Sequence, residues 1–193
     1  DYDERSVRGW TGNAGYDCSD PNAATEKWKW MDSIMPYVKS EQIFNCPSDR
    51  YSGSRQTYRY YKNLTAASCN NYGSYAQNNT YWQSQSTGLP PSSPGNDSRS
   101  LAAIPQPATT IQTVEGLGDY EFAWQDVASQ PSINTSANPR SLLTVTERHL
   151  ERTNVLFCDG HAKSMKLDYL VERNNVTSGP AAGAYRNLTV EED

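Results

Sequence analysis

One short run constrains the fold of this chain more than any other, residues 154–164, with the sequence NVLFCDGHAKS. Val155 and Phe157 share one face of an extended segment with high strand propensity, and the pair Asp159-Gly160 ends it. An Asp-Gly pair between two alternating runs indicates a hairpin closed by a type I′ turn, in which both central residues take positive φ. The sequence therefore predicts an antiparallel hairpin with Asp159 and Gly160 at its turn.

The two histidines of the chain flank this hairpin and raise the question of a metal or catalytic site. His149 ends a run rich in β-branched residues, for which we expect a strand over residues 142–148. Zinc needs three or four protein ligands, and no third histidine or close cysteine pair supplies them. A metal hydrolase is thus the least favoured hypothesis, and its residues would be His149, Asp159 and His161. We interpret the segment as a structural hairpin motif made of His149, Asn154, Asp159, Gly160 and His161.

A length of 193 residues fits a single domain, residues 1–193, with its own core. Only 36% of the residues are hydrophobic, and 13 tyrosines and 5 tryptophans supply much of the apolar surface. Such side chains can be half buried and still form hydrogen bonds. The net charge of −5 argues against a nucleic-acid partner, because phosphate binding needs a basic face. No segment has the apolar length of a membrane span.

The clearest helical pattern lies in residues 24–44, where Trp28, Met31 and Val38 recur at helical spacing. We expect an amphipathic helix that ends or bends near Pro36. Strands are expected at 109–115 and 142–148, and residues 167–174 suit a short closing helix or strand. One helix followed by sequential strands predicts an α+β fold with an antiparallel sheet. Long irregular segments complete it: an N-terminal loop (1–21), a Pro/Ser-rich surface loop (84–100) and a C-terminal tail (174–193).

The four cysteines are too far apart in sequence for a metal knuckle or a redox pair. If the protein is exported, disulfides are the alternative, with three possible connectivities. We prefer Cys46–Cys69, because this bridge would close a polar loop that has little core to hold it. Cys158 then either pairs with Cys18 or remains a buried free thiol.

Asparagine-linked glycosylation motifs are about twice as frequent as chance predicts for this content of Asn, Ser and Thr. Glycans on a protein surface would agree with export, although polar loops also generate this short motif freely. The candidate asparagines are Asn63, Asn78, Asn96, Asn134, Asn175 and Asn187. Asn96 and Asn187 are preferred, because both are expected to be exposed.

Three segments resemble, in the same order, signatures of type IV pilin-like and type II secretion pseudopilin-like proteins: residues 28–49, 72–78 and 148–161. The resemblance is to the large subgroup in Planctomycetes and Armatimonadetes, and the Asp-Gly-His stretch at 159–161 is its most specific part. The family's long hydrophobic N-terminal helix has no counterpart in these 193 residues. The similarity therefore covers a soluble headpiece alone.

The resemblance implies a noncatalytic structural subunit of an extracellular or cell-surface filament, pilus-like or tubular, with copies of the same chain as partners. The residues agree with a noncatalytic role, because the sequence shows no nucleophile–base pair and no phosphate-binding glycine loop. Tyr and Trp on polar loops would supply subunit contacts, as aromatic residues are favoured at interfaces.

The alternative is a secreted binding module for carbohydrate or calcium. No cofactor is required by the first hypothesis, but the resemblance makes calcium possible, since related pseudopilins often hold it in a loop. Carboxylates are suitable calcium ligands, although their spacing here matches no EF-hand. The candidates for calcium are Glu115, Asp119, Glu121 and Asp126, and those for stacking on sugar rings are Tyr60, Tyr61, Tyr81 and Trp82.

Overall fold

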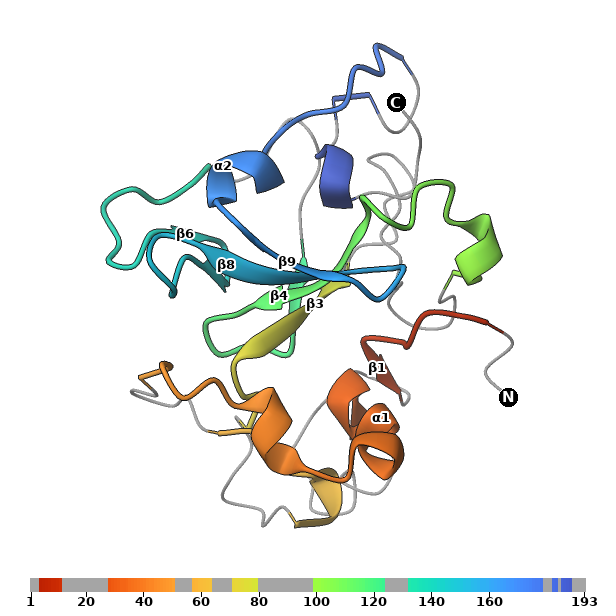
Figure 1. Cartoon of the computed structure of the whole chain (residues 1–193), viewed down its shortest axis with the longest axis vertical. Coiled ribbons are helices and arrows are strands. Elements are labelled where there is room, and N and C mark those ends of the chain that lie inside the picture. The colour runs from red at the N-terminus through yellow and green to blue at the C-terminus, as the bar shows by residue number, and fades with distance from the viewer. Residues whose placement is uncertain are drawn as a thin grey trace.

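The protein is described by a computed structural model over residues 4–11, 28–50, 57–63, 71–79, 99–123, 132–178, 182–183 and 185–188. Its centre is a five-stranded sheet with the strand order β5-β3-β4-β8-β9 (Figure 1). These strands are β3 (Tyr75–Asn79), β4 (Ile111–Glu115), β5 (Glu121–Ala123), β8 (Thr153–Phe157) and β9 (Ala162–Met165). The expected α+β class is confirmed, but the sheet is mixed, since β5 pairs with β3 in parallel.

The predicted hairpin is present as β8 and β9, which pair antiparallel from Thr153↔Met165 to Leu156↔Ala162. Its turn differs from the expected type I′. Gly160 has a φ of +91°, while Asp159 is not among the residues with positive φ. The Gly160 N–H donates to the Phe157 carbonyl, and the Phe157 N–H donates to the His161 carbonyl. This pattern is a three-residue loop with one glycine in the left-handed region, which needs positive φ only once.

The strand expected over residues 142–148 is split into two short strands, β6 (Ser141–Leu142) and β7 (Val145–Thr146). They pair with each other through Leu142↔Val145, and Leu143 between them has a φ of 52°. Both Leu142 and Val145 are buried in the core beside the sheet. The chain therefore reverses inside the β-branched run, because this places both apolar side chains in the same core.

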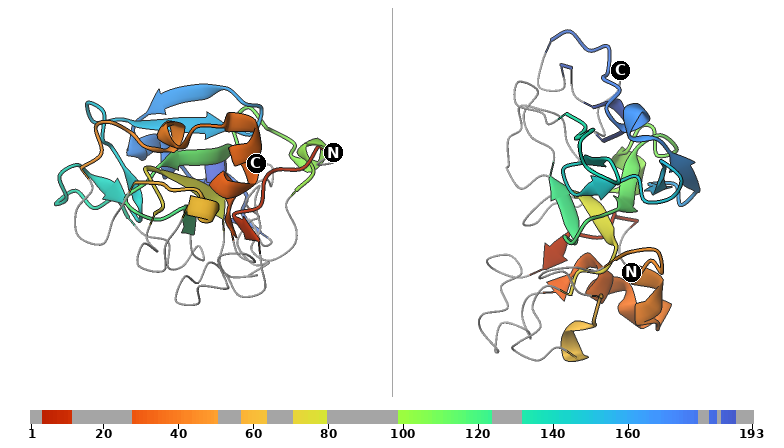
Figure 2. Two further views of the ribbon diagram at one scale, coloured as in Figure 1. Left: turned by 90° about the horizontal axis from the view of Figure 1, so that it is seen from below. Right: turned by 90° about the vertical axis from the view of Figure 1, so that its left-hand side faces the viewer.

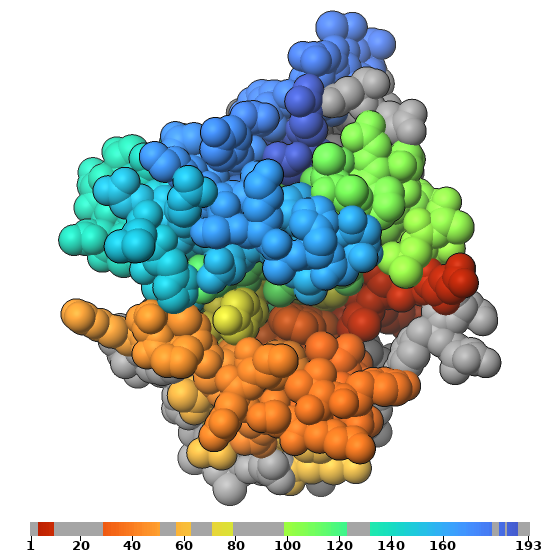
Figure 3. Space-filling model, viewed as in Figure 1, coloured from red at the N-terminus to blue at the C-terminus, as the bar shows by residue number. Residues whose placement is uncertain are grey.

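The predicted amphipathic helix is α1 (Trp30–Val38), and Pro36 lies within its last turn. Trp30 and Met31 are buried with Phe44, Tyr58 and Tyr120 in an apolar cluster, which we call the helix cluster. A second and larger apolar cluster, the sheet cluster, is built around Ile111, Val114, Val155, Phe157 and Leu167. Figure 1 and the side view of Figure 2 show the segment with α1 at one end of the molecule and the sheet above it. In the space-filling view the two parts meet along one continuous boundary (Figure 3).

Two of the expected irregular segments contain ordered contacts. The N-terminal loop holds β1 (Trp10–Thr11), which pairs with β2 (Trp28–Lys29). In the C-terminal segment, Tyr185 and Leu188 are buried in the sheet cluster, so the expected tail is in part a piece of the core. Of the Pro/Ser-rich loop, only Arg99 and Ser100 are among the described residues.

The remaining elements are short. Residues 167–174 are expected to form a short helix or a strand, and the structure has the helix α2 (Leu167–Leu170) there. Short 3₁₀ turns are η2 (Glu41–Phe44), η3 (Tyr61–Asn63), η4 (Leu101–Ala103) and η6 (Arg186–Leu188). Among the described helices, none has the length and apolar character that crossing a bilayer requires.

Candidate functional site

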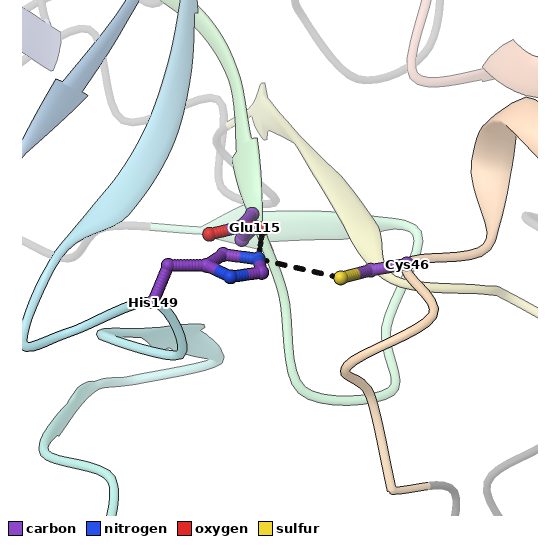
Figure 4. Close-up of side chains that lie close together, drawn as sticks. All are labelled: Cys46, Glu115 and His149. Carbon is purple, nitrogen blue, oxygen red and sulfur yellow. Dashed lines mark hydrogen bonds and ion pairs between the residues drawn. The ribbon is translucent and has the colours of Figure 1, made fainter.

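Three side chains that are far apart in the sequence converge where the segment that contains α1 meets the sheet (Figure 4). Nε2 of His149 lies 2.7 Å from Oε1 of Glu115 and 3.3 Å from Sγ of Cys46. The three side chains offer one ligand atom each, and these atoms all lie within 4.8 Å of one another. In the part of the chain that the structure describes, this is the one group of His, Cys, Asp and Glu side chains so arranged.

Local contacts fix two members of this cluster. Cys46 follows η2, and its backbone N–H donates to Oγ of Ser74 at 2.9 Å. Glu115 is the last residue of β4, and its carboxylate accepts hydrogen bonds from the backbone N–H of Asn154 at 2.9 Å and from Nδ2 of the same residue at 3.3 Å. Cys46 and Glu115 are both buried, with 5% and 0% of their surface exposed.

His149 is held by the tight turn that leads into β8. Its N–H and carbonyl form reciprocal hydrogen bonds with the carbonyl and N–H of Arg152, each 3.0 Å long. Between them Leu150 and Glu151 have φ angles of 49° and 59°. Positive φ at two consecutive non-glycine residues is strained, at about 1–2 kcal/mol each. The His149 side chain remains 35% exposed, so the cluster can be reached from its side.

The donor atoms define what this cluster can do. A sulfur, an imidazole nitrogen and a carboxylate oxygen are the usual protein ligands of zinc. A cysteine nucleophile with a histidine base would instead need the carboxylate on the other ring nitrogen, where it orients the imidazole. Here Glu115 and Cys46 meet at the same Nε2, so the carboxylate competes with the thiol for that nitrogen. The geometry therefore suits coordination better than proton relay.

The set expected for a metal hydrolase is not brought together. His161 lies at the end of β8 opposite to His149, and its Nδ1 is 2.6 Å from Oδ1 of Asp159. Its ring stacks on Phe157 with 4.3 Å between centroids. Hydrogen bonds from the backbone and the ring of His161 lower the pKa of Asp159. Asp159 and His161 therefore contact each other at the hairpin turn, and their structural role stays a prediction.

The preferred disulfide is not formed, because Cys46 is a free thiol directed at His149. Cys158 is a buried free thiol, which is one of its two predicted states. The other predicted state, a disulfide with Cys18, is not formed in this structure. Burial and the negative charge of Asp159 raise the pKa of Cys158 to about 12. Cys18 and Cys69 lie outside the described residues.

The candidate glycosylation sites differ sharply in exposure. Asn78 is fully buried, and its Nδ2 donates to the carbonyls of Ile111 and Leu188, so both amide hydrogens are engaged. Asn187 is 9% exposed, and its side chain donates to the carbonyl of Tyr169. The expectation that Asn187 is an exposed glycosylation site is therefore wrong. Asn134 and Asn175 are exposed. Asn96 and the side chain of Asn63 lie outside the described residues.

The residues considered for calcium and sugar binding do not form a site among the described residues. Glu115 belongs to the cluster with His149, Glu121 is buried, and Oδ1 of Asp119 accepts a hydrogen bond from the Tyr120 N–H. Burial raises the pKa of Asp119. The rings of Tyr60 and Tyr61 meet edge to face at 75°, so they do not form a flat stacking platform. Asp126, Tyr81 and Trp82 lie outside the described residues.

Comparison with known proteins adds no assignment to this geometry: no family model, no curated protein and no solved structure matches the chain. The cluster was missed in the sequence because Cys46 and His149 are separated by 103 positions. The sequence predicts Glu115 as an oxygen ligand, but only together with other carboxylates. The sequence pattern contained no signal that would join the three.

Proposed function

We propose that this chain is a noncatalytic structural subunit of an extracellular filament, pilus-like or tubular, in which its partners are copies of itself. The observation that carries the proposal is the packing of the three segments with a pilin-like resemblance. Cys46 from the first segment contacts Ser74 from the second through a hydrogen bond and His149 from the third through its sulfur. These contacts support a scaffold role for the three segments, which is the role expected in a structural headpiece.

The described surface carries apolar side chains that could form subunit contacts. Leu150 is 97% exposed at the tip of its turn, and Tyr37 and Ile43 are 72% and 60% exposed on the helix segment. Leu150 also lines a hollow of about 790 Å³, together with the charged residues Arg140 and Glu151. Burying one leucine side chain in a contact yields about 1.5–3 kcal/mol. A protein that displays such a residue on a strained turn gains stability when a neighbour covers it.

Electron microscopy of native material tests the proposal directly, and filaments or tubes are the expected result. The matched variants are Leu150→Asp and Leu150→Met. The aspartate should weaken assembly, because a charge would have to be desolvated in the contact, whereas methionine keeps the apolar surface. Sedimentation of native and variant protein at equal concentration measures this difference.

A native protein that is strictly monomeric in extracts, without filaments in the microscope, would refute the assembly. Equal assembly of Leu150→Asp and Leu150→Met would leave filament formation standing, but would remove this turn from the contact.

A further inference from the structure

We propose that Cys46, Glu115 and His149 bind one zinc ion, which fastens the segment after α1 to the central sheet. The three ligand atoms converge from the segment after η2, from the end of β4 and from the turn before β8 (Figure 4). This site lies beyond the proposed structural function, which assigns no metal to the chain. It gives the cluster a specific ligand, a divalent transition-metal cation.

The distances from Nε2 of His149 to the other two ligand atoms are close to those of a tetrahedral site, and all three atoms lie within 4.8 Å of one another. Zinc–ligand distances of 2.0–2.3 Å place the ligands of a tetrahedral ion about 3.3–3.6 Å apart. The Nε2–Sγ distance is 3.3 Å, and the Nε2–Oε1 distance of 2.7 Å is a direct hydrogen bond or ion pair. For zinc to bind, the direct contact between Nε2 of His149 and Oε1 of Glu115 has to open. The two atoms then separate by less than about 1 Å to reach the tetrahedral spacing.

Charge and donor type select the ion. On binding, the Cys46 thiol loses its proton, so that a thiolate and the Glu115 carboxylate face the metal. Two negative charges at a buried site are costly, and a doubly positive ion neutralises them. Calcium and magnesium prefer sites made only of oxygen ligands, while thiolate and imidazole favour zinc and its neighbours. The donor set therefore indicates zinc and not the calcium considered from the sequence.

The surroundings hold the ligands in place. Asn154 donates two hydrogen bonds to Glu115, and Ser74 fixes the backbone at Cys46. The turn that carries His149 keeps two non-glycine residues at positive φ, a strain of the kind that is concentrated at functional sites. Such outer contacts orient metal ligands and are worth 10–100-fold in affinity. Three protein ligands leave one tetrahedral position, which water can occupy from the exposed side of His149.

Metal binding is tested on the full chain, reduced and stripped of metal with a chelator. Addition of Zn²⁺ should load one equivalent, measured by elemental analysis after gel filtration and by competition with a chromophoric chelator. Co²⁺ in its place should give the ultraviolet charge-transfer band of a cobalt–thiolate bond. Cys46→Ser should abolish that band, and His149→Gln and Glu115→Gln should each weaken zinc binding at least tenfold, since even outer contacts contribute that much.

The matched controls are the other cysteines. Cys158→Ser removes a buried thiol away from the site, and a combined Cys18→Ser/Cys69→Ser variant tests the remaining two; both should bind zinc as the native chain does. Glu115→Gln keeps the shape of the side chain, so circular dichroism can separate loss of binding from loss of fold. A native chain that takes up no zinc, or zinc and a cobalt–thiolate band that persist in Cys46→Ser, would overturn the proposal.

Discussion

One tight turn precedes β8 and another follows it. The first has positive φ at residues that disfavour it, and the second has positive φ at a glycine. The turn at 149–152 places Leu150 and Glu151 in the left-handed region, although neither residue type favours it. The turn after β8 needs positive φ only at Gly160, where the conformational strain is small because glycine has no Cβ. The strained turn carries a residue of the cluster, and the relaxed one closes the hairpin.

Gly160 should be sensitive to substitution because of its backbone and not because of crowding. An added Cβ would meet nothing within 4 Å, but φ is +91°. We expect Gly160→Val to lower the free energy of unfolding by about 1–2 kcal/mol in urea titration, since a β-branched residue resists positive φ. Gly160→Asn should lose less, because asparagine tolerates this region better. Equal stability of the valine variant and the native chain would contradict this account of the turn.

At the scale of elements, α1 depends on a buried polar group at its start. Asp32 accepts the Lys29 N–H at 2.9 Å and the Tyr58 hydroxyl at 2.7 Å, and Nζ of Lys29 lies 3.1 Å from it. Burial lowers the pKa of Lys29 and raises that of Tyr58. The carboxylate thus caps the helix, compensates a buried cation and joins α1 to the segment around Tyr58.

Removal of this carboxylate should be among the most damaging single changes in the chain. We expect Asp32→Ala to cost about 3–5 kcal/mol, because it removes the carboxylate that lies 3.1 Å from the buried Lys29 ammonium. The double variant Lys29→Met/Asp32→Ala should recover part of that loss, since the buried ammonium is removed together with the carboxylate. Chemical unfolding of both variants measures the difference. A double variant as unstable as the single one would show that the charge of Lys29 is not the cause.

At the scale of the whole molecule, polar contacts join the segment that contains α1 to segments that lead into strands of the sheet. Nε1 of Trp30 donates to the Tyr120 carbonyl at 2.6 Å. Arg148 forms an ion pair with Asp49 at 3.0 Å, and both side chains are almost fully buried. The cluster around His149 lies on the same boundary. A metal ion there would add a further link between the two parts.

The packing of the whole molecule also restricts glycosylation. If the native protein is exported as proposed, Asn134 and Asn175 should carry glycans among the described candidates, since both are exposed. Asn78 and Asn187 should be unmodified, because a bulky hydrated sugar on a buried amide would break its hydrogen bonds. Peptide mapping of native protein after enzymatic deglycosylation identifies the modified residues. A glycan on Asn78 would contradict the burial described here.

The sequence by itself determined the β8–β9 hairpin, the amphipathic helix α1 and the α+β class. These depend on local signals, namely the alternation of Val155 with Phe157, the Asp-Gly pair and the helical spacing of Met31 and Val38. Only the tertiary structure decided the parallel pairing of β5 with β3, the burial of Asn78 and the meeting of Cys46 with His149. Each of these joins segments distant in the chain, and such contacts are selected by how the two apolar clusters pack, which no local pattern encodes.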